Sequence, residues 1–590
     1  MPNGFHHHGY RKYEKVEMKD AKKIIKLFIR YIKPYKFLFL LVFFLVLLTS
    51  SVEIISPYLI GKAIDSYIMP KNFNGFLNFI IICLTIYGLN SAISFFHGFF
   101  MLKTSQSIVY SIRKDLFSKI QTIPLEVIDT RPHGDIVSRI TNDVDSISNI
   151  LSNSIIHILM SLFIFCGIFI VMLRINVILT LVILIFIPFT LFTTRIIGRK
   201  ARNYFYQNQI LLGKINSVIE EDIPGLEVIK AFNREEKEIE KFSDFNNDFK
   251  KIGIKAQIYA GIVGPFMNFI NNINLVIIGG IGGYFAIKNL ITIGSIAVFI
   301  TYARQFSRPL NSLAEEFNQI QIALASGTRV KEILETEEEI EDGEIELPNV
   351  KGEIEFKNVY FSYVKDILVL KNVNFHINPG EVAALVGPTG AGKTTIVNLL
   401  ARFYEVDKGQ ILLDGIDIRK IKKSCLRNML AVVLQDAYIF SETIKENIRY
   451  GKPTANDEEI ENAAKISNAE KFILSLPSGY ETIISEERSL LSQGQRQLLA
   501  IARTILSEPK ILILDEAMSN VDPTTEKYVQ RAITNLIKGK TCIIIAHRLS
   551  TIKNADIIIV VENGQVVEQG THKELIEKKG YYYSLTAGVI

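Results

Sequence analysis

Six long apolar segments dominate the first half of the chain. They lie near residues 37–59, 76–102, 154–173, 176–196, 257–286 and 291–313. An α-helix needs about 20 predominantly apolar residues to cross a bilayer, so each segment is long enough to span one. Only the short stretch LRIN separates the third segment from the fourth, which predicts a tight hairpin. The pattern therefore predicts six membrane-spanning helices.

Two long polar stretches interrupt this pattern, one after the second apolar segment and one after the fourth. The first contains IDTRPHGDIVSRITNDVDSI, residues 128–147, and the second contains IEEDIPGLEVIKAFNREEKEIEKF, residues 219–242. Helix-breaking residues occur in both, at Pro132 and Gly134 and at Pro224 and Gly225. Because an even number of spans separates the two stretches, they fall on the same side of the membrane. We expect helical extensions there.

The distribution of basic residues predicts the orientation of these spans. The segment before the first span is rich in Lys and Arg, whereas the loop after that span has only Lys62 and Lys71. Basic residues are retained on the cytoplasmic side, so residues 1–36 are predicted to be cytoplasmic. Six crossings then return the chain to the cytoplasm. The basic residues before the first span include Lys22, Lys23, Lys26, Arg30, Lys33 and Lys36.

The second half of the chain has the composition of an ordinary water-exposed domain. The stretch 333–352 is acidic and contains Gly343 and Pro348, which predicts a linker. After it, strand-like runs such as VAALVG, ILILD and CIIIAH alternate with helical stretches, which indicates an α/β domain with a largely parallel sheet. The predicted boundaries are 1–36 for the N-terminal segment, 37–325 for the membrane domain, 326–351 for the linker and 352–590 for the α/β domain.

Composition excludes several other classes of protein. The chain has 590 residues, 48% of them hydrophobic, and a net charge of only +5, so it is not a dedicated nucleic-acid-binding protein. Its four Cys are far apart and predict neither a disulfide framework nor a zinc site. The N-terminal residues lack the apolar core of a signal peptide. These features suit a bacterial inner-membrane protein inserted through its own spans.

A phosphate-binding loop is predicted at GPTGAGKTT. This stretch follows the apolar strand EVAALV and precedes a helix, which is the context that such a loop requires. Glycines let backbone N–H groups surround phosphates, and the helix N-terminus adds its positive end. Lys393 is expected to contact the β- and γ-phosphates and Thr394 to bind Mg²⁺. The loop comprises Gly387, Pro388, Thr389, Gly390, Ala391, Gly392, Lys393, Thr394 and Thr395.

Two acidic residues end the later strand ILILD. Asp515 is placed to hold the shell of Mg²⁺ through water, and Glu516 can polarise the attacking water molecule. Adjacent acids at a strand end are often merely solvated. The phosphate-binding loop in the same domain favours catalysis of ATP hydrolysis instead.

These motifs make the chain resemble an ATP-binding cassette (ABC) exporter half-transporter. In such a protein six membrane helices precede one nucleotide-binding domain. The resemblance covers residues 20 to 590 and implies ATP and Mg²⁺ as cofactors. It implies that Tyr363 stacks on adenine, that Gln435 senses Mg²⁺ and the attacking water, and that His547 is the switch histidine. It also implies that LLSQGQ is the signature motif, and that this motif and Asp522 act across a dimer of two such domains. The signature residues are Ser492, Gln493, Gly494 and Gln495.

The same resemblance gives the stretches 128–147 and 219–242 a role. They are similar to the coupling segments of exporters, whose short transverse helices dock on the nucleotide-binding domains. Two merely solvated helices are the alternative. We favour coupling because both helix breaks lie at a similar depth on the cytoplasmic side.

Candidate residues of the transport pathway are polar residues inside the predicted spans. Arg304 would be costly facing lipid, so it is expected to face a cavity or a partner carboxylate, and Glu53 is a similar case. The fifth span contains Asn268 and Asn272. Asn residues in spans are at least as often hydrogen-bonding contacts between helices, and that alternative stays open.

Gln493 departs from the family pattern, which has Gly at this signature position. In a homodimer both ATP sites would carry the altered signature. In a heterodimer Gln493 would complete only the site of the partner, while Lys393, Glu516 and His547 serve a competent site. We therefore predict a heterodimer with a second half-transporter.

The predicted function is ATP-driven export of hydrophobic or amphipathic small molecules, of a multidrug or lipid-like class. Three alternative functions are considered for this architecture. A lipid or peptide flippase would have the same architecture, and an ATP-gated membrane protein would bind ATP without pumping. A cassette that acts on DNA or ribosomes would not be fused to six spans.

Overall fold

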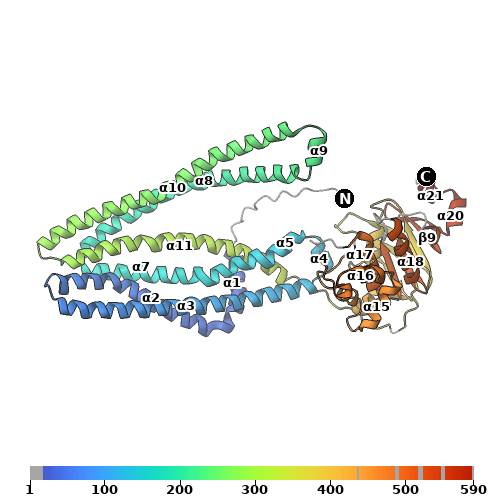
Figure 1. The fold of residues 1–590 in the computed structure, drawn as a ribbon, viewed down its shortest axis with the longest axis horizontal. Coiled ribbons are helices and arrows are strands. Elements are labelled where there is room, and N and C mark those ends of the chain that lie inside the picture. The colour runs from blue at the N-terminus through green and yellow to red at the C-terminus, as the bar shows by residue number, and fades with distance from the viewer. Residues whose placement is uncertain are drawn as a thin grey trace. The chain divides into compact units, whose positions relative to one another are not determined.

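The computed structural model describes residues 18–347, 349–434, 437–484, 491–515, 523–546 and 552–587 (Figure 1). The chain forms two compact units. The first, which we call the helical unit, comprises the chain up to Thr122 and Pro132–Thr336. The second, which we call the α/β unit, comprises Ile123–Arg131 and Glu337–Ile590. A short piece of the predicted membrane domain therefore belongs to the α/β unit.

Long helices build the helical unit, and each apolar segment of the sequence lies inside one of them, apart from at most two residues at its start. Helix α10 has 53 residues, which corresponds to about 80 Å at 1.5 Å per residue. This is much longer than the hydrocarbon core of a bilayer, about 30 Å, so the helix extends well beyond a span. The long helices are α1 (Met18–Ile32), α2 (Lys36–Ala63), α3 (Phe73–Thr122), α7 (Ile155–Ile175), α8 (Val177–Asp222), α10 (Glu235–Ile287) and α11 (Ile293–Leu334).

Within the part of the chain that the structure describes, four helical stretches are long and apolar enough to cross a membrane. They contain the first, second, third and fifth apolar segments of the sequence. The fourth and sixth segments lie in α8 and α11, which include residues whose side chains are outside the described part. The four stretches are Lys22–Ile68, Phe73–Thr122, His133–Ile175 and Glu235–Ile287.

Small residues let α2 and α11 approach closely near one end of the bundle. A Cβ atom on Gly61 would lie 2.4 Å from a methyl carbon of Val298, and one on Gly294 would lie 2.2 Å from the carbonyl oxygen of Gly61. Asp65 accepts a hydrogen bond from the backbone N–H of Gly294 at 2.8 Å. Close backbone approach at glycines is a common way for membrane helices to associate.

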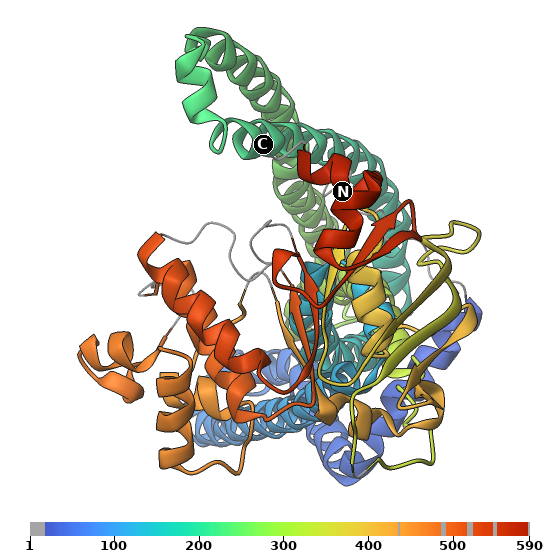
Figure 2. The same ribbon diagram turned by 90° about the vertical axis from the view of Figure 1, so that its right-hand side faces the viewer.

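Helices α8 and α10 form a long hairpin, which Figures 1 and 2 both show as a green pair of helices side by side. The helix break predicted at Pro224 and Gly225 lies at the tip, where the short helix α9 (Leu226–Ala231) joins the two. The stretch 219–242 therefore covers the tip and both adjoining helix ends. Large apolar side chains at the tip are exposed, including Leu226, Val228 and Phe232.

The stretch 128–147 is divided between the two units. Its first residues end helix α4 (Leu125–Asp129), which belongs to the α/β unit. After Pro132 the helical unit resumes with α5 (His133–Ser138) and α6 (Val144–Asn149). Arg139, between these helices, is buried and pairs with Glu332 of α11 at 2.9 Å.

In the described part of the α/β unit the strands form two sheets. One has the order β2-β1-β4-β5 and is antiparallel. The other has the order β10-β9-β3-β8-β7-β6 and is parallel except for the edge strand β10. The antiparallel strands are β1 (Ile354–Phe361), β2 (Leu370–Ile377), β4 (Lys408–Leu413) and β5 (Ile416–Asp417). The others are β3 (Val382–Val386), β6 (Leu430–Val433), β7 (Ile511–Asp515), β8 (Thr541–Ile545), β9 (Ile557–Glu562) and β10 (Gln565–Gly570).

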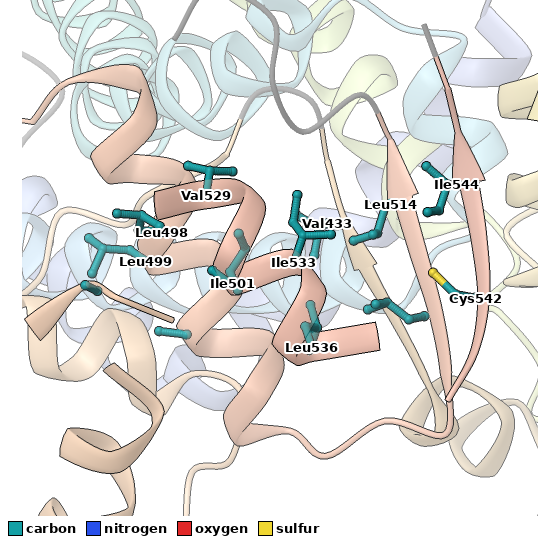
Figure 3. Close-up of a cluster of buried hydrophobic side chains, with 14 of the residues drawn as sticks. Val433, Leu498, Leu499, Ile501, Leu514, Val529, Ile533, Leu536, Cys542 and Ile544 are labelled. Atoms are coloured by element: carbon teal, nitrogen blue, oxygen red, sulfur yellow. The ribbon is translucent and has the colours of Figure 1, made fainter. Parts of the chain in front are cut away.

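The parallel sheet is buried on both faces, as its continuous aliphatic strands predict. On one face Ala384, Leu514 and Ile544 pack against helices α17 (Gln493–Leu506) and α18 (Pro523–Ile537). Figure 3 shows Leu498 and Val529 of these helices in that cluster. On the other face the alternate strand residues pack against α12 (Lys393–Leu400) and the antiparallel sheet. The remaining helices are α13 (Lys423–Met429), α14 (Ile444–Arg449), α15 (Asp457–Ile466), α16 (Glu470–Ser475), α20 (His572–Lys578) and α21 (Tyr581–Ala587).

The acidic segment expected as a linker is held on the α/β unit by ion pairs. Helix α11 continues past residue 326 to Leu334, and the acidic residues after it bind basic residues near α13. Glu339 forms a bidentate pair with Arg427, at 2.6 and 2.9 Å. Asp342 accepts from Arg402 at 2.8 Å. The acidic side chains of this segment therefore bind it to the basic residues Arg402 and Arg427.

Arg402 is the most deeply buried charge in this contact. Its side chain is 0% exposed and donates hydrogen bonds to the carbonyl oxygens of Ile418 and Ile421, in addition to its bonds to Asp342 and Glu405. Buried carbonyl groups need a donor, and this guanidinium supplies two of them.

The substitution Arg402→Ala is expected to destabilise the α/β unit by about 2–4 kcal/mol, because two buried carbonyls lose their donor and a cavity remains. For a domain of this size the midpoint of thermal unfolding should fall by about 5–10 °C. Scanning calorimetry of the purified chain would measure this. Arg419→Ala is the matched control, because Arg419 is 44% exposed and pairs with Asp417. An equal fall of the unfolding midpoint in the two variants would contradict the structural role given to Arg402.

Candidate nucleotide site

The loop that joins β3 to α12 has the backbone conformation of a phosphate-binding loop. Gly390 and Gly392 have φ of 83° and 104°, in the left-handed region. Gly392 also lacks room for a side chain, since a Cβ there would lie 2.6 Å from Leu370. The loop therefore turns tightly, and its backbone N–H groups meet the N-terminus of α12. This arrangement suits an anion such as a phosphate group.

Lys393 lies at the start of α12 with its side chain folded back into the loop. It is 6% exposed, and its Nζ donates to the carbonyl oxygens of Gly387 at 2.6 Å and Pro388 at 3.0 Å. These contacts hold the ammonium group where phosphates of a nucleotide would meet the loop. Thr394, the next residue, is exposed, whereas Thr395 is buried.

Asp515 lies at the same edge of the parallel sheet as the loop. It is the last residue of β7 and pairs in register with Ile545 of β8, the strand between β7 and β3. The carboxyl ends of parallel strands meet at one edge, where ligands of such sheets bind. The fold thus brings Asp515, Lys393 and Thr394 to this edge.

Four of the predicted site residues lie outside the described part of the chain: Gln435, Glu516, Asp522 and His547. Three of them closely follow described strands in the sequence. Glu516 comes directly after β7, and Gln435 and His547 come two residues after the ends of β6 and β8. Those strand ends are at the same edge as Asp515.

Tyr363 lies beside the phosphate-binding loop and helix α12. Its hydroxyl donates to Oγ1 of Thr395 at 3.3 Å and accepts from the amide of Asn398 at 3.3 Å. The side chain is 41% exposed, so its ring is accessible to a planar ligand. The rings of Phe361 and Tyr404 pack nearly perpendicular to it, with ring centroids 4.8 and 4.9 Å away.

The signature residues begin helix α17. Ser492 caps the helix by accepting from the N–H of Gln495 at 3.3 Å, and the Gln495 side chain accepts from the N–H of Ser492 at 2.9 Å. This reciprocal pair is a capping box. Gln493 is the first helical residue and is half-buried. Its backbone φ is not positive, so this position does not require glycine. Gly494, which follows it, is buried.

Tyr404 and Arg503 belong to no motif in the sequence, so their roles are visible only in the structure. Arg503 of α17 donates to the carbonyl oxygen of Asn447 at 2.9 Å and stacks on Phe440 and Tyr450. It thereby connects the signature helix to the segment that follows β6. The aromatic residues that follow β6, among them Phe440 and Tyr450, are the signal in the sequence for this contact. Burial lowers the pKa of Arg503.

Tyr404 contacts both Tyr363 and helix α4. Its hydroxyl donates to Oδ2 of Asp129 at 2.6 Å. Burial, and then this bond to a carboxylate, raise the pKa of Tyr404 well above its ordinary value. The tyrosine therefore stays protonated and remains a hydrogen-bond donor.

The predicted pathway residues lie on three different helices of the helical unit. Glu53 of α2, Arg304 of α11 and both Asn268 and Asn272 of α10 have exposed side chains. Asn274, on the same helix as the last two, is 9% exposed, and its Oδ1 is enclosed.

Comparisons with known proteins match both units. The family described as the ABC transporter transmembrane region matches residues 39–310, and the family described as ABC transporter matches residues 370–519. The ABC transporter ATP-binding protein YfiC of Bacillus subtilis, described as uncharacterized, is 42% identical over 574 residues, 97% of this chain and 95% of that protein.

Two further relatives have names that state a transported compound. The fatty acid ABC transporter ATP-binding/permease protein of Mycobacterium bovis is 41% identical over 483 residues, 82% of this chain and 76% of that protein. The ATP-dependent lipid A-core flippase of Syntrophus aciditrophicus is 36% identical over 541 residues, 91% of this chain and 89% of that protein.

These matches confirm the predicted fold class, a helical membrane domain followed by an α/β ATPase domain. They also confirm a membrane protein that binds nucleotide. The chain belongs to the ABC transporter family and is an exporter half-transporter, a transport ATPase with its membrane domain and its ATP-hydrolysing domain in one polypeptide.

Proposed function

We propose that this half-transporter pairs with a second, different half-transporter and exports hydrophobic or amphipathic compounds across a bacterial cytoplasmic membrane. One observation carries the proposal: a complete phosphate-binding loop lies in the same unit as a signature helix that begins with Gln493. The first feature supports hydrolysis at the site of this chain. The second supports an unequal pair of sites.

The described residues fit ATP with Mg²⁺. The backbone of the loop and Lys393 suit the phosphates, and the accessible ring of Tyr363 suits adenine. Among the described residues no group of three His, Cys, Asp or Glu could hold a metal ion. Mg²⁺ takes few protein ligands and keeps several waters and phosphate oxygens, so Thr394 and Asp515 match what it needs. Mg²⁺ would neutralise charge that develops on the phosphates.

The chain's own residues then have separate roles in hydrolysis. Lys393 holds the β- and γ-phosphates, and Asp515 and Thr394 orient the metal. Glu516 accepts a proton from the attacking water, while Gln435 and His547 position the water and the γ-phosphate. These last three roles rest on the family motifs and on the ends of β6, β7 and β8, which lie at the same edge of the sheet as the phosphate-binding loop.

The heterodimer follows from the arrangement of sites across a pair of half-transporters. A signature helix acts on the nucleotide of the partner, with Asp522 beside it. Gln493 puts a side chain on the helix end that glycine leaves bare, so it alters the partner's site alone. The competent site then combines the loop of this chain with an unaltered signature from the partner.

The substrate class is inferred from relatives and from membrane topology. Fatty acids and lipid A, named for two relatives, are both amphipathic. The basic N-terminal segment supports cytoplasmic placement of the N-terminus and of the ATPase domain. Arg304, Glu53, Asn268 and Asn272 are the proposed polar contacts of the pathway.

ATPase activity of the chain alone and together with the product of a neighbouring half-transporter gene tests the pairing. We expect at least tenfold higher ATPase activity for the pair than for the chain alone. This activity should be lost when Glu516→Gln is introduced in this chain alone, because the competent site needs that base.

The pair that carries Glu516→Gln should also fail to transport. Transport at the full rate would favour an ATP-gated protein. A lone chain that is an active dimer would contradict the heterodimer.

Gln493→Gly separates the two pairings more directly. In the heterodimer the total ATPase rate should change less than twofold, because Gln493 completes the slower site. In a homodimer both sites would change, so a rate change above about fivefold would contradict the unequal pair. Lys393→Ala is the positive control and should abolish hydrolysis at the competent site.

Export by the purified pair in lipid vesicles tests the substrate class. A labelled fatty acid and a cationic dye would be compared under the same ATP concentration. Arg304→Ala is expected to lower transport of the fatty acid at least fivefold, because a guanidinium in a span attracts a carboxylate. Arg202→Ala, at an exposed position of α8 beyond its apolar segment, is the control. Equal transport by the two variants would remove Arg304 from the pathway.

A further inference from the structure

Helix α4 belongs to the α/β unit, although more than two hundred residues of sequence separate it from the rest of that unit. Ile123, just before it, is 8% exposed. Asp129, its last residue, accepts the 2.6 Å hydrogen bond from Tyr404. Glu126 of the same helix also lies close enough to raise the pKa of Tyr404 by its charge. The hydrogen bond from Tyr404 to Asp129 therefore ties this short helix to the rest of the α/β unit.

Tyr404 makes its second contact with the ring that is proposed to hold adenine. Its ring is nearly perpendicular to that of Tyr363, at 89°, with centroids 4.9 Å apart. Phe361 makes edge-to-face contacts with both rings. Such edge-to-face contacts favour one ring orientation. Tyr404 is only 8% exposed, whereas Tyr363 is 41% exposed, so the buried ring supports the accessible one.

The backbone around Tyr404 is fixed independently of α4. Two residues earlier, Arg402 adopts a positive φ of 50°, and its buried guanidinium bonds to Ile418 and Ile421. The N–H of Phe403 donates to the carbonyl oxygen of Asn398 in α12. Tyr404 therefore projects from a rigid turn, and the hydroxyl end of its ring is what α4 holds.

We propose that Tyr404 is a positioning residue of the adenine site and that its hydrogen bond to Asp129 makes ATP binding depend on docking of α4. The proposal rests on the adenine-stacking role given above to Tyr363. A docked α4 holds the Tyr404 ring by its hydroxyl, and that ring holds Tyr363 in the orientation that accepts adenine. By linkage, bound ATP strengthens the docking of α4 by the same factor. The base of the nucleotide thereby acts on a segment of the membrane domain, apart from the phosphates.

The experiment measures KM for ATP and kcat of the assembled transporter for three variants of this chain. Tyr404→Phe and Asp129→Ala should each raise KM about 3- to 10-fold with kcat within twofold, since an interaction used only for binding is lost. The double variant should raise KM no more than either single change, because both remove one bond. Asp129→Asn keeps an acceptor oxygen and should restore KM to within twofold of the unaltered chain.

Tyr31→Phe is the matched control. Tyr31 donates to Asp115 at 2.8 Å in the helical unit, so the same chemical change is made at a bond with no link to the adenine ring. Its KM should be unchanged. Three outcomes would each overturn the proposal. The increases in KM could multiply in the double variant, KM could stay unchanged in both single variants, or kcat could fall while KM stays the same.

Tyr363→Ala separates a failure of this proposal from a failure of the adenine site. If Tyr363→Ala leaves KM for ATP unchanged, the adenine role is wrong and the proposal falls with it. If Tyr363→Ala raises KM while Tyr404→Phe and Asp129→Ala do not, the adenine role stands and only the connection to α4 is refuted.

Discussion

The nucleotide site depends on how closely backbone packs around the loop between β3 and α12. A Cβ on Gly387 would lie 2.0 Å from the carbonyl oxygen of Val561 in β9, and one on Gly564, in the β9–β10 turn, would lie 2.0 Å from that of Val369. The N–H of Gly564 donates to Ala391 of the loop. Both sheets thus touch the loop, one through β9 and the other through the start of β2. Bare backbone at these glycines is what sets the position of the α12 N-terminus.

The position of the α12 N-terminus determines where the other residues of the site lie, because they contact this helix or the turn after it. The helix carries Thr395, which binds the Tyr363 hydroxyl, and it ends at the rigid turn of Arg402 and Tyr404. The same turn receives the acidic segment through Asp342. The proposed contacts with phosphate and adenine, the acidic segment after Glu337, and α4 therefore all depend on the position of this one short helix. A displacement of α12 cannot be confined to one of them.

Much of this arrangement could be predicted from sequence, because it is local. The apolar segments, the loop at 387–395 and the helix break at Pro224 each depend on neighbouring residues, and their physics can be read from a short stretch. The contact of Asp129 with Tyr404 joins residues 275 positions apart, and no local pattern marks either one. The acidic stretch near 340 shows the same limit. Its composition indicates a solvated linker, but complementary charges on α13 bind it.

The backbone at Gln493 does not need the glycine that the family pattern has at this position. Glycine at a helix start is expected where the backbone needs freedom, yet this position is an ordinary first turn held by the capping box of Ser492 and Gln495. The positive end of α17 is therefore preserved whatever side chain stands there. What distinguishes Gln493 from glycine at this position is therefore its side chain, on a residue that is only half-buried. In the proposed heterodimer its amide would stand beside the partner's nucleotide, while the fold that presents the helix end stays as it is.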